Sequence, residues 1–272
     1  MKPLVTVERL GLATRDSPVF SDLSFRLERG ALTVLLGPSG SGRSALLLAV
    51  SGRMAGLTGT VGLGDRTRTR PTDLRRCTSL ARLATLVGPE DKLTVAESLT
   101  ERALIDGVRV ADAERAVAVS EQAFALAFPR DRLVEELGAY ERALLCVALA
   151  VVRPAELVLL DDADRGLDVA DQIRLYAALE RLCATGPAVL AATTERAAVP
   201  AGVAVIPLPA RPGTPARGRS VRPGGAAPGT AATDPLPDEA DEAAGAAGAD
   251  EGPVDDPHTA RDDTPDDDGK TL

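Results

Sequence analysis

The stretch LTVLLGPSGSGRSALLL, residues 32–48, joins two apolar runs through a glycine-rich turn. Its centre, residues 37–44, matches the phosphate-loop pattern G-x-x-x-x-G-K-[ST] except that Arg43 stands where the pattern has lysine. A strand that leads into such a turn and then a helix makes an anion site, because backbone N–H groups and the helix dipole face the ligand. The predicted phosphate-binding residues are Gly37, Pro38, Ser39, Gly40, Ser41, Gly42, Arg43 and Ser44.

Composition divides the 272-residue chain unevenly. Residues 210–272 lack aromatic side chains and carry 14 acidic and 6 basic residues, so they hold −8 of the total charge of −9. Such a segment buries too little apolar surface to offset its ordering entropy, and we expect a disordered tail rich in Pro, Ala, Gly and Asp. It is either a solvated extension or a partner-binding or autoinhibitory segment. Residues 1–209 are the predicted folded domain.

Several classes of protein are disfavoured by the sequence. Three scattered cysteines, Cys77, Cys146 and Cys183, predict neither a disulfide framework nor a zinc site. The N-terminus has charges where a signal peptide needs an apolar core, and the longest apolar run, residues 143–152, is shorter than the roughly 20 residues of a membrane span. We expect a soluble, cytoplasmic protein. No nucleic-acid partner is expected, because the folded part is near neutral and shows no basic stripe or aromatic platform.

Short β-type runs alternate with helical patterns, which is typical of a mostly parallel α/β sheet. We expect strands at residues 4–10, 22–27, 31–36, 59–65, 81–87, 157–162 and 188–193, and helices at 44–54 and 169–183. The second of these helices is expected to bury Val169, Ile173, Tyr176 and Cys183. Three further helical faces follow one another without a strand and predict a helical insert over about residues 94–152. Their members are Val95, Leu99 and Ala103 (with Gly107 ending the helix); Ala113, Val117, Ser120, Phe124 and Ala127; and Tyr140, Leu144, Val147 and Val151.

A second motif complements the glycine-rich turn. The run LVLLD places Asp161 at the carboxyl end of a buried strand, where its carboxylate can hold Mg²⁺ opposite the Ser44 hydroxyl. Ser44 and Asp161 are therefore the predicted metal ligands, and the two motifs together are typical of a P-loop NTPase. Arg43 keeps the positive charge, but its guanidinium is wider than an ammonium and rigidly forked. Binding through backbone N–H groups should tolerate this change better than catalysis does.

From these motifs the chain resembles the nucleotide-binding subunit of ATP-binding cassette (ABC) transporters over roughly residues 5–207. Residues 137–161, LGAYERALLCVALAVVRPAELVLLD, align without a gap with the family segment that runs from the L-S-G-G-Q signature to the magnesium aspartate. The segment DDADRGLD stands where the family has D-E-P-T-x-G-L-D, and LTVAESL resembles its L-T-V-x-E-N-L. The resemblance implies a P-loop NTPase of ABC type, with a helical insert and an N-terminal antiparallel β part.

The resemblance also implies roles for single residues. Asp162 occupies the position of the glutamate that polarises the attacking water, and Thr194 that of a histidine contacting the γ-phosphate. Asp168 matches the nucleotide-binding D-loop aspartate. The candidate catalytic residues are therefore Asp162, Arg43 and Thr194. Aspartate is one methylene shorter than glutamate, and a misplacement of about 1 Å can cost on the order of 10²-fold in rate. The signature reads LGAYE, and no glutamine occurs in VGPEDKLTV, where the family has one.

Two functions fit these residues. The first is an ATP-binding subunit that binds Mg-ATP and couples binding, with slow hydrolysis, to a separate membrane permease at the inner face of the cell membrane. The alternative is a non-hydrolysing nucleotide-binding subunit with a regulatory or structural role. The resemblance implies a dimer that sandwiches nucleotide, either a homodimer or a heterodimer with another ABC subunit. The altered signature favours a heterodimer with a more complete partner.

Overall fold

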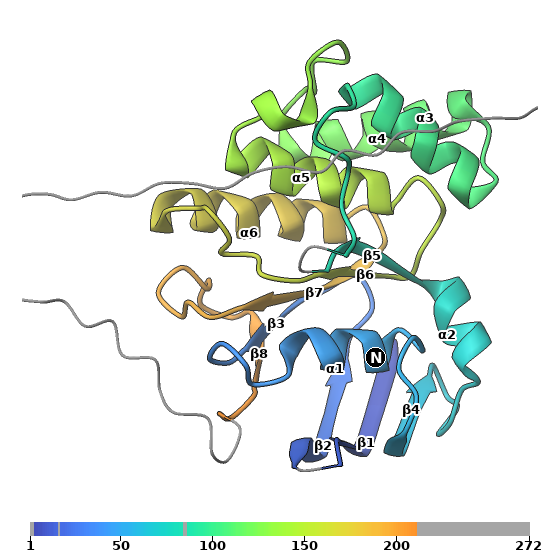
Figure 1. Cartoon of the computed structure of the whole chain (residues 1–272), viewed down its shortest axis with the longest axis vertical. Coiled ribbons are helices and arrows are strands. Elements are labelled where there is room, and N and C mark those ends of the chain that lie inside the picture. The colour runs from blue at the N-terminus through green and yellow to red at the C-terminus, as the bar shows by residue number, and fades with distance from the viewer. Residues whose placement is uncertain (1–2, 16, 84–85, 211–272) are drawn as a thin grey trace, which may run out of the picture. The chain divides into compact units, whose positions relative to one another are not determined.

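The computed structural model describes residues 3–15, 17–83 and 86–210, and these lie in one compact unit. An antiparallel sheet has the strand order β2-β1-β4, and a parallel sheet has the order β5-β6-β7-β3-β8 (Figure 1). The predicted α/β class is confirmed. The tail beyond residue 210, predicted to be disordered, lies outside the described residues.

The strands are β1 (Val5–Ala13), β2 (Pro18–Leu27), β3 (Leu32–Leu36), β4 (Leu57–Leu63), β5 (Thr78–Arg82), β6 (Leu157–Leu160), β7 (Ala188–Thr193) and β8 (Ala204–Pro207). The helices are α1 (Arg43–Val50), α2 (Pro71–Cys77), α3 (Val95–Asp106), α4 (Val110–Phe124), α5 (Ala139–Ala150) and α6 (Val169–Cys183), with a short 3₁₀ turn η1 (Val134–Glu136).

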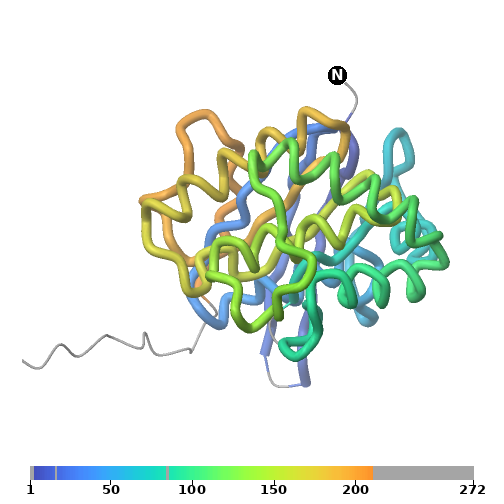
Figure 2. Tube along the Cα trace, turned by 90° about the horizontal axis from the view of Figure 1, so that it is seen from above, coloured from blue at the N-terminus to red at the C-terminus, as the bar shows by residue number. Residues whose placement is uncertain are grey.

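The parallel sheet separates two apolar cores. Because side chains alternate along a strand, Val34 of β3 joins the core formed with α3 to α6, whereas Leu35 joins the core formed with α1 and the antiparallel sheet. Strands β6 and β7 are buried along their whole length, which explains their continuous apolar sequences. Figure 2 looks down on the helical side, with green and yellow helices lying over the blue N-terminal strands.

The helical insert forms as predicted between β5 and β6. Its first helix, α3, begins with a capping box in which Thr94 and Glu97 each bond the other's backbone N–H, at 3.2 and 2.8 Å. It ends at Gly107, whose φ of 66° is readily accessible to glycine. The apolar positions Val95, Leu99 and Ala103 are all buried.

Four expectations are wrong in detail. The strand expected at residues 81–87 is β5, Thr78–Arg82, because the polar Thr78 is buried with its hydroxyl donating to the Leu74 carbonyl (2.8 Å). Helix α2 and the edge strand β8 have no counterpart among the predicted elements. Ala127 is exposed beyond the end of α4, and the neighbouring Phe128 is buried instead. On α6, Val169 and Ile173 are exposed, because the buried stripe follows Gln172, Leu175, Leu179 and Leu182.

The insert depends on α5, and Leu144 offers a direct test. Its side chain is fully buried in the core shared with α3, α4 and α6. We expect Leu144→Ala to lower the free energy of unfolding by about 2–5 kcal/mol, since it removes buried methyl groups and leaves a cavity. Leu104→Ala, at a side chain that is 72% exposed, should change it by no more than about 0.5 kcal/mol. Urea titrations of both variants measure this, and equal losses would contradict the assignment of α5 to the core.

Candidate functional site

The glycine-rich turn between β3 and α1 forms a tight cradle. The Gly37 N–H donates to the Thr193 carbonyl at the end of β7 (3.2 Å), which ties the turn to the neighbouring strand. Gly42 has a φ of 95°, and a Cβ placed on it would lie 2.8 Å from the Val19 side chain of β2. Glycine is therefore required at this position both by backbone conformation and by the hairpin packed against it.

The cradle has unsatisfied donors that suit an anion. In the part of the chain that the structure describes, no side chain caps the N-terminus of α1, so the N–H groups of its first turn stay open to a ligand. The buried Ser41 Oγ and Arg43 Nε also have no hydrogen-bond partner among the described residues. Buried polar atoms are costly when unpaired, and phosphate oxygens arriving in the cradle would pair them. The residues present therefore fit a nucleotide phosphate.

Arg43 lies inside this cradle and joins it to the end of β6. The residue is 8% exposed, and its guanidinium donates through Nη1 to the Gly37 carbonyl and pairs through Nη2 with Asp162 Oδ1 at 2.9 Å. A carboxylate and a phosphate are bound by a guanidinium in the same way, through charge-assisted hydrogen bonds. A phosphate entering the cradle would therefore compete with Asp162 for Arg43.

The two predicted metal ligands are in contact. The Ser44 hydroxyl donates to Asp161 Oδ2, and the Asp162 N–H donates to Asp161 Oδ1 at 3.0 Å. Asp161 is fully buried, and this burial raises its pKa above the usual 3.8, against the opposing effect of the Ser44 hydrogen bond. A hydroxyl and a carboxylate are the oxygen ligands that Mg²⁺ prefers. These residues therefore fit the predicted metal ion.

Arg82 is a site residue that sequence reasoning missed. From the end of β5 it donates through Nε to the Asp161 carbonyl (3.2 Å) and through Nη2 to the Asp162 carbonyl (2.5 Å). In return, the Asp161 N–H donates to the Arg82 carbonyl at 3.0 Å. No motif marks this arginine. The only sequence signal is a charged residue in an apolar segment.

Two predicted site residues lie outside this hydrogen-bonded cluster. The Thr194 backbone N–H donates to Asp164 Oδ2 at 3.0 Å, and its hydroxyl bonds the same oxygen. Asp168 caps α6 by accepting from the Asp171 N–H at 2.8 Å. These contacts place Thr194 beside the turn that follows β6 and give Asp168 a structural task. Their proposed roles toward nucleotide stay predictions.

The altered signature opens α5. The Gly138 N–H donates to Glu141 Oε2 at 3.1 Å, which satisfies a donor at the helix start. Tyr140 in the first turn is covered by the guanidinium of Arg174 from α6, at 4.3 Å from the ring centroid. This cation–π contact holds a bulky ring where the signature of the resembled family has glycine.

A groove of about 600 Å³ leads from Arg82 toward the helical insert. Its walls come from the segment after β5, the start of α5 and the turn after β6, and include Leu86, Val87, Pro89, Ala139, Arg142 and Arg165. A smaller cavity of about 70 Å³ shares Val87, Gly88, Pro89 and Cys146 with it and adds Ile105. Leu86 and Ile105 are 79% and 70% exposed. Leu86 lines the groove, and Ile105 lines the smaller cavity beside it.

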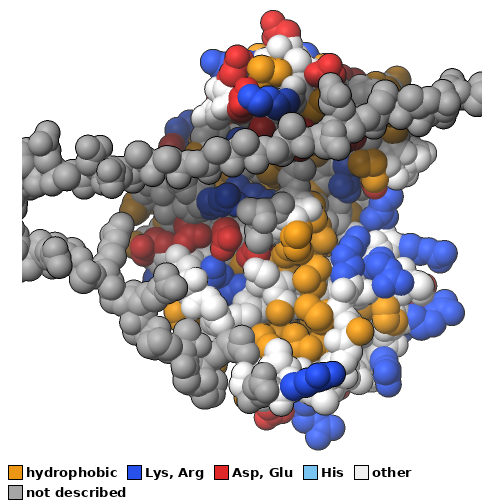
Figure 3. All heavy atoms as spheres, in the orientation of Figure 1, with side chains coloured by type: hydrophobic (Ala, Val, Ile, Leu, Met, Phe, Trp, Pro, Cys, Tyr) orange, Lys and Arg blue, Asp and Glu red, His pale blue; other side chains and the backbone are white. Residues whose placement is uncertain are grey.

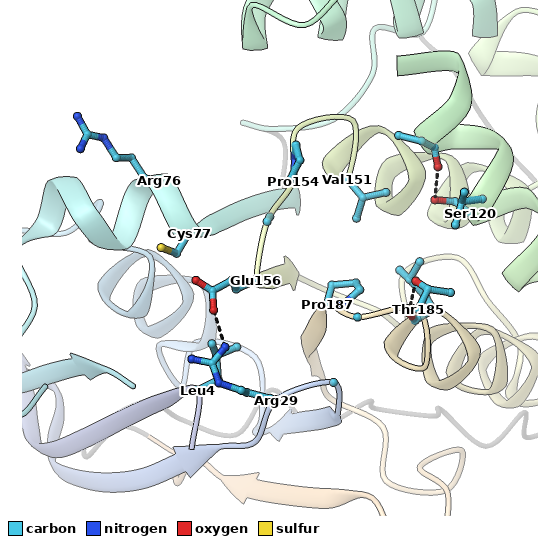
Figure 4. Close-up of a pocket in the computed structure, with 16 residues that line it drawn as sticks. Leu4, Arg29, Arg76, Cys77, Ser120, Val151, Pro154, Glu156, Thr185 and Pro187 are labelled. Carbon is cyan, nitrogen blue, oxygen red and sulfur yellow. Dashed lines mark hydrogen bonds and ion pairs between the residues drawn. The ribbon is translucent and has the colours of Figure 1, made fainter. Parts of the chain in front are cut away.

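A second cavity, of about 540 Å³, lies at the opposite ends of the parallel strands (Figure 4). Cys77 and Glu156, which line it, immediately precede β5 and β6. Several of its polar groups are paired within the chain, among them Arg29 with Glu156 (2.6 Å) and the Thr185 hydroxyl with the Leu182 carbonyl (2.7 Å). Its walls include none of the predicted site residues.

Figure 3 shows Lys and Arg side chains gathered over α2 and β4. The exposed arginines of this patch are Arg66, Arg68, Arg70, Arg75 and Arg76. Asp73 pairs with Arg70 at 3.1 Å and with Arg66 at 3.8 Å, so part of the charge is neutralised. The net charge of the folded part is near neutral and therefore does not reveal this local concentration of arginines. The expectation that the folded part has no basic stripe is wrong on this face. The absence of a nucleic-acid partner stays a prediction.

Among the described residues, no helix has the length and apolar character to cross a membrane.

Known proteins are similar to this chain in sequence and in fold. The family described as ABC transporter matches residues 20–165. The Cobalt import ATP-binding protein CbiO of Rhodobacter capsulatus is 31% identical over 203 residues, covering 72% of this chain and 71% of that protein. The Cytochrome c biogenesis ATP-binding export protein CcmA of Roseobacter denitrificans is 32% identical, covering 70% and 83%. A solved ATP-binding cassette of an ABC transporter has a TM-score of 0.65 at 18% identity, covering 76% of this chain and 88% of that one, which shows the fold.

The buried carboxylate of Asp161 predicts a pH dependence of stability. Its pKa is raised in the folded chain, so the folded state holds the proton more tightly than the unfolded state does. The contribution of this one carboxyl group to the free energy of unfolding is then greatest below its usual pKa of 3.8. That contribution falls as the pH rises through the raised pKa of the folded state. We expect Asp161→Asn to raise the free energy of unfolding at pH 7 in buffer free of Mg²⁺ and nucleotide, and to lose this advantage near pH 4.

Urea titrations at the two pH values measure this effect. The control is Asp131→Asn, which changes an exposed carboxylate outside the site and should leave stability unchanged within about 0.5 kcal/mol. An Asp161→Asn variant less stable than the unmodified chain at pH 7 would contradict the prediction.

Proposed function

The chain belongs to the ABC transporter family as an ATP-binding subunit, and from this premise we propose that it binds Mg-ATP and couples binding, with slow hydrolysis, to a separate membrane permease. The observation that carries the proposal is the cradle itself. An uncapped helix N-terminus, a buried guanidinium and two unpaired buried polar atoms converge there. Together they make a site prepared for the phosphates of a nucleotide.

Binding is proposed to proceed by exchange at Arg43. The backbone N–H groups at the start of α1 bind phosphate oxygens, and the Arg43 guanidinium transfers from Asp162 to the phosphate. Ser44 and Asp161 would hold Mg²⁺, which when bound neutralises charge on the phosphate oxygens. Asp162, released from its ion pair, is then free to accept a hydrogen bond from water.

Turnover is expected to be slow for two reasons. Asp162 is shorter than the glutamate of the family, and it must first give up its pairing with Arg43. Thr194 cannot supply the charge of a histidine, and Asp164 already accepts the hydrogen bond of its hydroxyl. These two engaged side chains are the observation that favours the second candidate, a nucleotide-binding subunit that does not hydrolyse ATP.

The proposed assembly is a dimer in which the start of α5 from one subunit faces the phosphate loop of the other. Tyr140 under Arg174 supports a heterodimer, because the ring occupies the first turn of α5, where a compact signature would approach phosphate. A partner with a complete signature would then close over this cradle. The same chain could still pair with itself in an open arrangement.

The proposed contact with the permease is the groove beside the helical insert, which places the protein at the inner face of the membrane through its partner. Leu86 and Ile105 support this, since both present exposed apolar surface beside the groove. The two relatives are named for import and for export. We therefore propose no direction of transport for this chain and no transported substrate.

The experiment that tests the proposal is a single-turnover assay with the full-length chain in large excess over labelled Mg-ATP, following both retention and cleavage of the nucleotide. We expect retention with slow cleavage, and loss of cleavage in Asp161→Asn. Asp162→Glu should speed cleavage by up to about 10²-fold, because the side chain of glutamate is one methylene longer and brings the carboxylate closer to the attacking water. The control is Asp131→Asn, which should match the unmodified chain.

The outcomes separate the candidates. Retention without cleavage in every variant would favour the non-hydrolysing subunit. Neither retention nor cleavage, at a protein concentration high enough for dimers, would contradict both candidate functions.

The permease contact has its own test at Ile105. We expect Ile105→Lys to lower the membrane-bound fraction in cells that contain the cognate permease by roughly tenfold or more, because it replaces exposed apolar surface of the proposed contact by a charge. Ile173→Lys is the matched control, since Ile173 is 50% exposed on α6 and lines neither the groove nor the smaller cavity that Ile105 lines. Cell fractionation measures both variants, and equal retention at the membrane would contradict the contact.

A further inference from the structure

Arg82 is the least expected member of the site. It ends β5, is 9% exposed, and points its guanidinium at the turn that follows β6. Its two hydrogen bonds reach the consecutive carbonyls of Asp161 and Asp162, and its own carbonyl accepts from the Asp161 N–H. The backbone that carries both carboxylates is thus fixed by one side chain and one strand.

The turn that Arg82 binds has an unfavourable backbone conformation. Asp162 has a φ of 45°, in the left-handed region that non-glycine residues adopt rarely and at some energetic cost. The planar fork of a guanidinium suits two adjacent carbonyl oxygens, which a lysine ammonium cannot bond with the same geometry. The side chain of Arg82 is therefore matched to this backbone shape.

The shape decides where both carboxylates point. The Asp161 carboxylate contacts the Ser44 hydroxyl, and the carboxylate of the next residue, Asp162, contacts the Arg43 guanidinium. If the turn relaxed, both contacts would be lost together, because the two residues share one peptide unit.

We propose that Arg82 is a positioning residue of this site: it fixes the Asp161–Asp162 turn so that Asp161 is presented to the metal of Mg-ATP and Asp162 to the end of the phosphate chain. This inference rests on the proposed binding of Mg-ATP. In this role Arg82 acts through the two backbone carbonyls that it bonds, and not as a ligand of the nucleotide or the metal. Residues that orient metal ligands in this way typically contribute about 10- to 100-fold to metal affinity.

The test compares ATP binding by the full-length chain with Mg²⁺ and with EDTA, by calorimetry, and takes the ratio of the two dissociation constants. We expect Arg82→Met to reduce this magnesium-dependent gain by roughly 10- to 100-fold. Binding of metal-free ATP, held by the backbone of the cradle, should change by no more than about twofold. Arg82→Lys keeps the charge and one donor, and should give an intermediate ratio.

The matched control is Arg153→Met. Arg153 also donates to backbone carbonyls, those of Arg76 (2.5 Å) and Thr78 (3.2 Å), but it lies outside the site. Loss of stability alone would affect both variants, whereas only Arg82→Met should change the magnesium ratio. Should Arg82→Met fail to fold, Arg82→Lys carries the same comparison.

The outcomes keep the two proposals distinguishable. An unmodified chain that binds ATP with a magnesium-dependent gain, together with an Arg82 variant whose ratio is unchanged, would overturn the role of Arg82 alone. An equal change in Arg153→Met would overturn it as well. An unmodified chain that binds ATP in neither buffer would overturn both the proposed function and this inference.

Discussion

Two buried guanidinium groups on either side of one acidic turn are the constraint on which the site depends. Arg43 reaches Asp162 from the start of α1, and Arg82 reaches the carbonyls of Asp161 and Asp162 from the end of β5. The turn therefore joins β3, β5 and β6 at their carboxyl ends. Buried charges persist only when they are paired and hydrogen-bonded. The parallel sheet, by bringing these three ends together, makes that pairing possible.

In this arrangement, groups that would bind phosphate and metal lower the stability of the folded chain. Asp161 loses hydration in the folded chain, and Ser41 and Arg43 keep polar atoms without partners among the described residues. Each of these is unfavourable in the empty site and becomes useful when phosphate and metal enter. The Arg43–Asp162 pair partly compensates, because it gives the cradle an internal anion. The same pair explains how a chain with altered motifs can keep the shape of the site.

The sequence predicts the fold class well because it depends on periodicity, which is local. Apolar runs mark β3, β6 and β7, and the glycine turn fixes where α1 begins. The cradle and the Ser44–Asp161 contact could be predicted because the carboxyl ends of all strands in one parallel sheet lie at the same edge, here with β7 between β3 and β6. The role of Arg82 could not be predicted, since its place depends on the register of β5 against β6. In addition, β5 begins at the buried polar residue Thr78, which is earlier than the apolar pattern indicates. The buried face of α6 was predicted only in part: Tyr176 and Cys183 are buried as expected, whereas the apolar Val169 and Ile173 are exposed.

The replacement of lysine by Arg43 has a consequence for chemical labelling. Reactive acyl-phosphate nucleotides identify ATP sites by acylating a neutral lysine amine near the phosphates. A guanidinium stays protonated at neutral pH and is not a nucleophile under those conditions. Only three lysines occur in the whole chain, and Lys92 is paired with Glu135 at 2.7 Å. A nucleotide could therefore occupy this cradle fully and leave no covalent mark on the phosphate loop, so that amine-directed surveys would count the protein among those that bind none.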